Sequence, residues 1–123
     1  MLALVLDDSR AMRTILRRIL LDAGFDVLDA ADGREGLALL DAGAVPDVAL
    51  VDWNMPVLDG FEFLTALRAN EEWRRVVVMM VTTESEHSSI VRALANGADE
   101  YVIKPFTAEA ITEKLNLLGL LPV

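Results

Sequence analysis

The chain has 123 residues, a formal net charge of −9 at pH 7, 54% hydrophobic residues and no cysteine. This length fits a single domain, which we expect to span residues 1–123, and the absence of cysteine excludes a disulfide framework and a thiolate metal site. The negative charge disfavours nucleic acid and anionic membrane surfaces as direct partners, because like charges repel.

Short apolar runs alternate along the chain with apolar residues spaced three or four apart. In chain order, the pattern predicts a strand at 2–6, a helix around 12–20, a strand at 25–29, a helix around 37–40, a strand at 48–51, a helix around 61–67, a strand at 76–81, a helix around 90–94, a strand at 100–103 and a helix around 111–118. Gly24, Gly43 and Gly97 stand where helices are expected to stop, and Thr107 is a candidate N-cap for the last helix.

Five repeats of strand and helix predict an α/β domain with a parallel sheet, right-handed crossovers and helices on both faces. In such sheets, ligands bind at the carboxyl ends of the strands. The longest apolar run, residues 76–81, is far shorter than the ~20 residues of a membrane helix. The N-terminal segment also lacks the features of a signal peptide. We therefore expect a cytoplasmic protein that does not enter membranes.

Chemically specialised residues follow the predicted strands. Asp7 and Asp8 follow the first strand, Asp52 the third, Thr82 the fourth and Lys104 the fifth. Carboxylates gathered at one edge of the sheet repel one another, so a cation is expected between them, and Mg²⁺ suits an all-oxygen site. Lys104 adds a compact positive charge that suits a phosphate group.

This set of groups supports phosphoryl transfer to a carboxylate. Asp52 would attack an activated phosphoryl group in line, while Mg²⁺ and Lys104 neutralise charge on the phosphoryl oxygens. The hydroxyl of Thr82 can donate a hydrogen bond to one of these oxygens. The acyl phosphate formed is labile, so it serves as a timed signal.

The same residues carry a resemblance to a known family. The chain resembles the receiver domains of two-component response regulators over essentially its whole length, and among them the stand-alone chemotaxis regulators. Asp8 precedes Asp52 by 44 residues, and Thr82 and Lys104 follow Asp52 by 30 and 52 residues, which are the intervals of that family. Other matching positions are Asp7, the stretch 51–56, Asp59, Gly60, Tyr101, Pro105 and Phe106. The resemblance implies a flavodoxin-like, doubly wound sheet of five parallel strands in the order 2-1-3-4-5, with five helices.

The resemblance also implies a role for each matching position at the site. Asp52 accepts a phosphoryl group from a phosphohistidine of a sensor histidine kinase or a phosphotransfer protein. Lys104 and Thr82 contact the phosphoryl group. The implied Mg²⁺ ligands are Asp7, Asp8, Asp52 and the backbone carbonyl of Asn54. The bond between Lys104 and Pro105 is expected to be cis, which proline permits at a cost of about 0.5–1 kcal/mol.

Four positions carry implied roles in switching and timing. Inward movement of Thr82 lets Tyr101 swing from an exposed to a buried position. This movement reshapes the surface formed by the fourth helix, the fifth strand and the fifth helix. Asn54 and Glu84 tune the rate of self-dephosphorylation. The resemblance thus implies a phosphoacceptor signalling domain that catalyses only its own phosphorylation and dephosphorylation.

Residues outside these motifs have simpler interpretations. Trp53, next to the phosphoacceptor, is expected to pack locally and to report on metal and phosphate by its fluorescence. The first helix presents a solvated basic face, which in the family also docks the phosphotransfer partner: Arg13, Arg17 and Arg18. The apolar segment 117–123 is expected to pack partly on the domain, with a partner or weak dimer surface as the alternative to a monomer.

Alternative functions differ in what they require of the same positions. The flagellar motor switch is the expected target, and a phosphorelay intermediate or phosphate sink is the alternative among single-domain receivers. A phosphatase of the haloacid dehalogenase type needs a carboxylate where Asn54 stands, because an amide cannot shuttle a proton. A flavodoxin would have to hold its FMN phosphate where Asp7 and Asp8 would repel it.

Overall fold

The strands form one parallel sheet in the predicted order. In the computed structural model, which describes residues 1–83 and 87–121, the strands pair as β2-β1-β3-β4-β5. Their bounds are β1 Leu2–Leu6, β2 Asp26–Ala30, β3 Val48–Asp52, β4 Val77–Thr83 and β5 Glu100–Lys104. The flavodoxin-like order and the parallel pairing are therefore confirmed.

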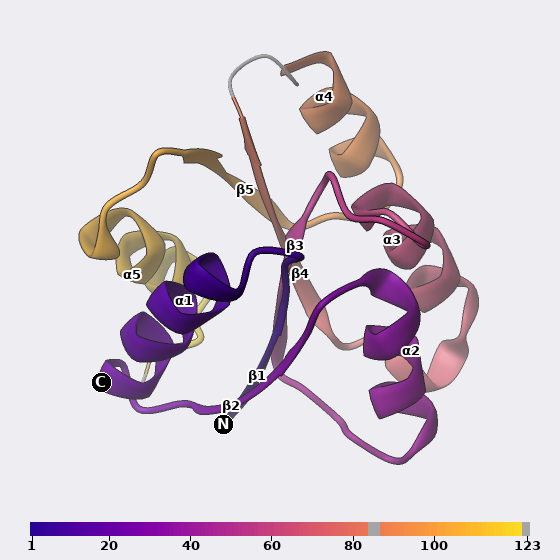
Figure 1. The fold of residues 1–123 in the computed structure, drawn as a ribbon, viewed down its shortest axis with the longest axis horizontal. Helices are drawn as coiled ribbons and strands as arrows, with labels where there is room; N and C mark the ends of the chain where they lie inside the picture. The colour runs from indigo at the N-terminus through magenta and orange to yellow at the C-terminus, as the bar shows by residue number, and fades with distance from the viewer. Residues whose placement is uncertain (84–86, 122–123) are drawn as a thin grey trace.

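The helices cover both faces of this sheet. Their bounds are α1 Arg10–Asp22, α2 Gly33–Asp41, α3 Gly60–Ala69, α4 His87–Ala95 and α5 Ala108–Leu117. Figure 1 shows α1 and α5 on one side of the sheet and α2, α3 and α4 on the other. The chain thus builds three layers, with the carboxyl ends of all strands on one edge.

Each face of the sheet buries its own core. Successive side chains of a strand point to opposite faces, so Leu50 packs with the apolar residues of α1 and α5, while Val51 packs with those of α2 and α3. Every residue of β3 is buried. Burial on both faces explains why the strands appear in the sequence as continuous apolar runs.

The observed element boundaries differ from the predicted ones at a few places. β2 begins one residue later than expected, and β4 runs from Val77 to Thr83 rather than over 76–81. A 3₁₀ helix, Glu71–Trp73, was not predicted, and it follows Asn70, whose side chain accepts a hydrogen bond from the Glu72 N–H at 2.9 Å. Trp73, the last residue of this short helix, is half-buried and packs against the core beneath α2 and α3.

Helix ends follow the local chemistry of the chain. Gly24, Gly43 and Gly97 each adopt a positive φ, at 97°, 107° and 107°, just after α1, α2 and α4, a conformation that costs glycine little. Thr107 caps α5 as predicted, because its hydroxyl accepts a hydrogen bond from the Ala110 N–H at 3.1 Å. At the C-terminal side, Leu118 packs on the core beneath α1 and α5.

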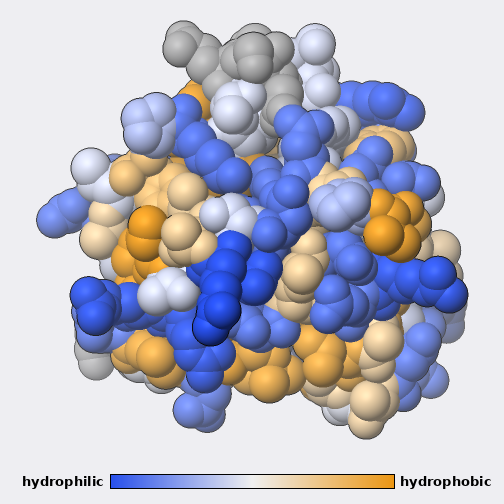
Figure 2. Space-filling model, in the orientation of Figure 1, coloured by the Kyte–Doolittle hydropathy of each residue, from blue (hydrophilic) through white to orange (hydrophobic). Residues whose placement is uncertain are grey.

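Hydrophilic side chains dominate one visible face of the molecule. In Figure 2 they gather at the centre of this face, where the loop from β1 to α1 lies in Figure 1, and apolar side chains form separate patches around them. Many of the apolar residues of the chain lie inside the two cores instead.

None of the helices in the described part of the chain is long and apolar enough to cross a membrane.

The loop between β3 and α3 contains a strained turn. The N–H of Leu58 donates to the carbonyl of Pro56 at 2.8 Å, which closes a γ-turn on Val57, and Val57 has a φ of 70°. This hand of γ-turn is rare and strained, and a positive φ is particularly unfavourable for a β-branched residue. Val57 is 70% exposed, so little packing offsets the strain.

Relief of this strain should stabilise the fold. We expect Val57→Asn to raise the free energy of unfolding by about 1 kcal/mol, because asparagine tolerates the left-handed region. Urea denaturation measures the change. Val45→Asn is the matched control, since Val45 is 72% exposed and has no positive φ. Equal effects of the two substitutions would contradict the strain.

Candidate functional site

Three carboxylates meet at the carboxyl edge of the sheet. Asp7 and Asp8 follow β1, and Asp52 ends β3, the neighbour of β1 in the sheet. One carboxylate oxygen from each of the three lies within 4.8 Å of the others. Asp7 and Asp52 are buried, at 1% and 7% exposure, whereas Asp8 is exposed. The topology therefore brings together the acidic residues that the sequence singled out.

Lys104 bridges the two buried carboxylates. Its Nζ lies 3.3 Å from Oδ2 of Asp7 and 3.2 Å from Oδ1 of Asp52. Lys104 ends β5 at the far side of β4, so its long side chain reaches across the strand ends to make these contacts. The peptide bond between Lys104 and Pro105 is cis, as the resemblance implies.

Backbone contacts hold the first acidic residue in place. Oδ1 of Asp7 accepts a hydrogen bond from the N–H of Ser9 at 2.8 Å, and the carbonyl of Asp7 accepts one from Nη1 of Arg13, also at 2.8 Å. Ser9 is the N-cap of α1. Arg13 is thus half-buried rather than fully solvated, whereas Arg17 and Arg18 are exposed as predicted, although Arg17 also donates to the carbonyl of Val27 at 3.2 Å. Sequence reasoning missed both anchors of Asp7, although Ser9 carries the signature of an N-cap.

The environment changes the proton affinity of the pair. Burial, together with the charge of Asp7, raises the pKa of Asp52 from 3.8 to about 6, against the opposing effect of Lys104. Burial alone would lower the pKa of Lys104, but the carboxylates of Asp52 and Asp7 outweigh burial and raise that pKa above its ordinary value. One lysine therefore neutralises the cluster incompletely, which leaves an excess of negative charge that a second cation would relieve.

The raised pKa predicts how stability depends on pH in the absence of divalent cations. Between pH 3.8 and about 6, Asp52 loses its proton more readily in the unfolded chain than in the folded one, so stability falls as pH rises through this range. At 1.36 kcal/mol per pKa unit, the loss is on the order of 3 kcal/mol.

Thermal and urea unfolding at several pH values in EDTA would measure this loss. The comparison is with Asp52→Asn, which lacks the titrating group but keeps the other carboxylates. We expect the unaltered protein to lose more stability than Asp52→Asn between pH 4 and pH 7. Parallel pH profiles for the two proteins would show that the Asp52 carboxyl is not desolvated as the structure describes.

The remaining predicted residues lie at the carboxyl ends of β3 and β4. Asn54 is exposed in the loop after β3, and Thr82 is buried near the end of β4. By strand alternation, Asp52 and Lys104 extend the face covered by α1 and α5, since Leu50 and Val102 lie in that core. Thr82 instead follows Met80 on the opposite face. Glu84 lies outside the described residues.

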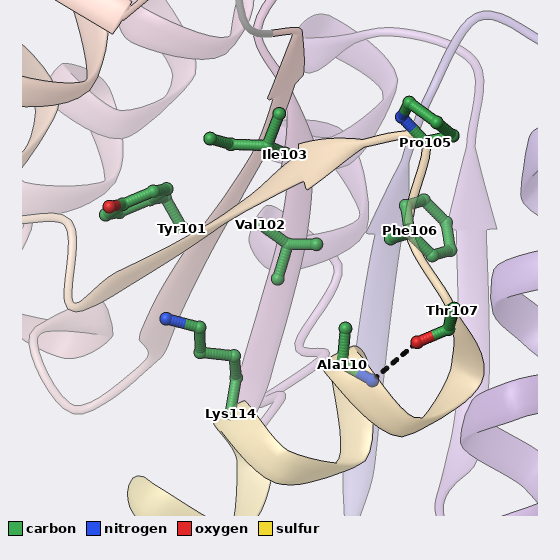
Figure 3. A pocket seen from close by; sticks show the side chains of 8 residues that line it. All are labelled: Tyr101, Val102, Ile103, Pro105, Phe106, Thr107, Ala110 and Lys114. Atoms are coloured by element: carbon green, nitrogen blue, oxygen red, sulfur yellow. Dashed lines mark hydrogen bonds between the residues drawn. The ribbon is translucent and has the colours of Figure 1, made fainter.

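Tyr101 shares the face of Thr82 and lies against a hollow between β5 and α5. It pairs with Met80, and Thr82 pairs with the residue two positions after Tyr101. A cavity of about 370 Å³ lies beside it, lined mainly by apolar side chains, including Phe106 and Ala110. Figure 3 shows Lys114 of α5 pointing toward Tyr101 across this hollow.

Two charged neighbours hold Tyr101, and neither was predicted. Nζ of Lys114 lies 5.2 Å from the centre of the Tyr101 ring and 3.2 Å from Oε1 of Glu100. The same Glu100 oxygen accepts a hydrogen bond from the Tyr101 N–H at 2.9 Å. Tyr101 is half-buried in this arrangement. No pattern in the sequence places a lysine of α5 over a side chain of β5.

The donor set of the cluster fits a hard divalent cation. Three carboxylates offer oxygen ligands within a small volume, and oxygen ligands are those that Mg²⁺ and Ca²⁺ prefer. Lys104 already acts as one cation between two of them. The cluster could therefore hold a metal ion.

Comparison with known proteins places the chain in a family. Residues 3–116 match the response regulator receiver domain. The chain is 38% identical to chemotaxis protein CheY1 of Helicobacter pylori over 116 residues, 94% of each chain. It is 40% identical to chemotaxis protein CheY of Pseudomonas aeruginosa over 113 residues, which cover 91% of this chain and 90% of that protein. The solved structure of chemotaxis response regulator CheY4 of Vibrio cholerae superposes with a TM-score of 0.88 at 38% identity, covering 95% of this chain and 97% of that one.

These matches bear on the alternatives weighed from the sequence. The two relatives named above, which are 38% and 40% identical over nine-tenths of the chain, are chemotaxis proteins, and neither is a phosphatase or a flavodoxin. The fold alone would not separate these classes, because a flavodoxin shares the strand order. The acidic cluster and the family match together favour the signalling class.

Proposed function

The chain belongs to the response regulator receiver domain family, and on this premise we propose that it is a phosphorylation-switched signalling domain, acting over residues 1–123, with Asp52 as the phosphoacceptor. The observation that carries the proposal is the pair of buried carboxylates bridged by Lys104 beside a third, exposed carboxylate. The phosphodonor is a phosphohistidine on a sensor histidine kinase or a phosphotransfer protein.

The transfer uses the groups of the site in distinct ways. A carboxylate oxygen of Asp52 attacks the phosphorus of the phosphohistidine; a P–O bond forms, the P–N bond breaks, and the electron pair leaves with the imidazole nitrogen. Nζ of Lys104 lies 3.2 Å from Oδ1 of Asp52. Its ammonium can therefore stabilise the negative charge of the carboxylate before the transfer and that of the phosphoryl oxygens after it. The hydroxyl of Thr82 is the proposed second donor to these oxygens.

A divalent cation is the proposed cofactor of the site. Asp7, Asp8, Asp52 and the carbonyl of Asn54 would hold Mg²⁺, which when bound supplies positive charge next to the transferring phosphoryl group. Asp8 is the exposed member of the cluster, so it can take up the ion from solvent without unpacking the core. Asn54 and Glu84 are the proposed determinants of the lifetime of the acyl phosphate.

The output is a change in the surface made by α4, β5 and α5. Thr82 and Tyr101 lie on one face of neighbouring strands, which supports movement of the ring when Thr82 is drawn toward a phosphoryl group. The hollow beside Tyr101 lies between β5 and α5. The proposed target is the flagellar motor switch, in line with the chemotaxis proteins that the chain resembles. We further propose that the domain acts in the cytoplasm as a monomer.

Acetyl phosphate provides a direct test of the phosphoacceptor. In a Trp73→Phe background, addition of acetyl phosphate and Mg²⁺ should change Trp53 emission, because Trp53 adjoins Asp52. Intact-mass measurement should show one added phosphoryl group. Asp52→Asn should abolish both signals, since an amide nitrogen or oxygen is a poor nucleophile. A response that survives in Asp52→Asn would refute the assignment.

A second experiment separates signalling to a motor from a role in a relay. The protein activated with beryllofluoride should bind a flagellar switch protein more tightly than the inactive protein does. A phosphorelay intermediate or phosphate sink would instead return its phosphoryl group to a histidine of the kinase or of a phosphotransfer protein. Rapid back-transfer without any gain in switch binding would favour the relay.

A further inference from the structure

Three aromatic and cationic side chains connect the phosphoacceptor strand to α4. The rings of Trp53 and Phe61 lie 5.5 Å apart between centroids, tilted by 42°. Cζ of Arg92 lies 4.1 Å from the centroid of the Phe61 ring, well inside the range of a cation–π contact. Trp53 follows Asp52, Phe61 lies in the first turn of α3, and Arg92 lies in α4.

The first part of this connection is rigid. The N–H of Gly60 donates to the carbonyl of Trp53 at 3.0 Å, and a Cβ on Gly60 would lie 2.4 Å from the carbonyl oxygen of Asp52. The start of α3 is therefore in close backbone contact with the end of β3. Because Phe61 is the next residue after Gly60, its ring extends from backbone that is in close contact with the backbone of Asp52.

The second part holds α4, whose C-terminal end is also joined to α3, because Nε of Arg68 donates to the carbonyl of Gly97 at 2.9 Å. Within the described residues of α4, Ile90 and Ala93 are buried, whereas Val91 and Leu94 are 64% and 41% exposed. The side chain of Asn96 donates to the carbonyl of Arg92 at 2.7 Å, which fixes the backbone from which Arg92 extends. The Arg92 guanidinium thus adds an attachment to α3 from within α4, beside the one that Arg68 makes just after the end of the helix.

We propose that Arg92, through its stack on Phe61, fastens α4 to the Trp53 end of the phosphoacceptor strand and so couples the position of α4 to events at Asp52. Arg92 is a positioning residue in this arrangement, because it acts through Phe61 and Trp53. The fastening itself is independent of the proposed function, whereas its use in signalling rests on that function. Coupling of this kind is reciprocal, so a partner bound at α4 would also alter the site.

Hydrogen exchange of the full-length protein without metal tests the fastening. Arg92→Ala should speed exchange of the α4 amides several-fold and make Trp53, in a Trp73→Phe background, more accessible to acrylamide. Arg92→Lys, which keeps a cation, should recover part of both effects. Arg75→Ala is the control, since Arg75 is an exposed arginine just before β4. Equal α4 exchange in Arg92→Ala and Arg75→Ala would overturn the proposal.

A double-mutant comparison distinguishes the stack from a general effect of lost charge. Phe61→Leu should reproduce the faster exchange of α4, and adding Arg92→Ala to it should change little, because the partner ring is already gone. Effects that simply add would mean that Arg92 acts elsewhere, and would overturn the stack as the cause.

Activation by beryllofluoride and Mg²⁺ tests the coupling to Asp52. In the unaltered protein we expect the emission of Trp53 and the exchange of α4 to change together. In Arg92→Ala the emission should still change, whereas the change in α4 exchange should fall at least twofold. An undiminished α4 response would overturn the coupling. No emission change in the unaltered protein would instead count against the proposed function, and the metal-free exchange would still decide the fastening.

Discussion

Saturating Mg²⁺ should raise the melting temperature of this protein by roughly 10 °C. A ligand at one hundred times its Kd stabilises the folded state by about 2.7 kcal/mol, and a domain of this size shifts by a few degrees per kcal/mol. The physical source is the acidic cluster, in which Lys104 is the one lysine bridging two buried carboxylates beside a third. Differential scanning calorimetry in EDTA and in Mg²⁺ measures the shift.

Substitution of one exposed ligand separates metal binding from a general salt effect. Asp8→Asn should raise the melting temperature in EDTA slightly, because it removes one of three carboxylates that repel one another, yet it should remove most of the Mg²⁺ response. Glu113→Gln on α5 makes the same change of charge at an exposed position away from the cluster and should keep the full response. If Asp8→Asn responds as strongly as the unaltered protein, the ion binds elsewhere.

The fold was predictable because its strands are buried on both faces. A strand such as Val48–Asp52 is a continuous apolar run up to Asp52, which differs from the spacing of three or four residues between the apolar residues of a helix. Glycines with a positive φ follow α1, α2 and α4 where the sequence predicts that these helices end. Strand ends were less certain, since β4 extends through polar Thr82 and Thr83 by pairing with β5. The 3₁₀ helix at Glu71–Trp73 escaped prediction because three residues carry no periodicity.

The site was predictable to the extent that topology alone assembles it. Parallel strands end at one edge, so Asp7, Asp52 and Lys104 had to lie near one another. The contacts that orient these side chains form between different helices and strands, and the spacing of residues in the sequence does not indicate them. Arg13 on the Asp7 carbonyl is one example, and Arg92 on Phe61 is another. Such pairs lie far apart in the sequence or belong to different layers, so only the packed structure identifies them.

Gly60→Ala should destabilise the protein by about 3 kcal/mol. A Cβ at this position would lie 2.4 Å from the carbonyl oxygen of Asp52 and 2.9 Å from Cα of Trp53. Both are backbone atoms of the phosphoacceptor strand end, so no side chain can rotate away, and relief requires α3 or the strand end to move. Gly60 has no positive φ, so backbone conformation would not contribute to the loss. Urea denaturation measures it.

Gly36→Ala provides a comparison within a neighbouring helix. Its Cβ would meet the ends of the Leu6 side chain at 2.7 and 2.8 Å, and a side chain can shift where a carbonyl cannot, so the loss should be clearly smaller. Gly60→Ala should in addition weaken the Mg²⁺ response of Trp53 emission, because it displaces the peptide that carries Asp52. Similar losses for the two variants, with the Mg²⁺ response intact in both, would show that α3 does not set the geometry of the site. The expected contrast makes the close approach of α3 to β3 part of the site itself: a bulkier residue at the helix start would move the carboxylate on which the proposed chemistry depends.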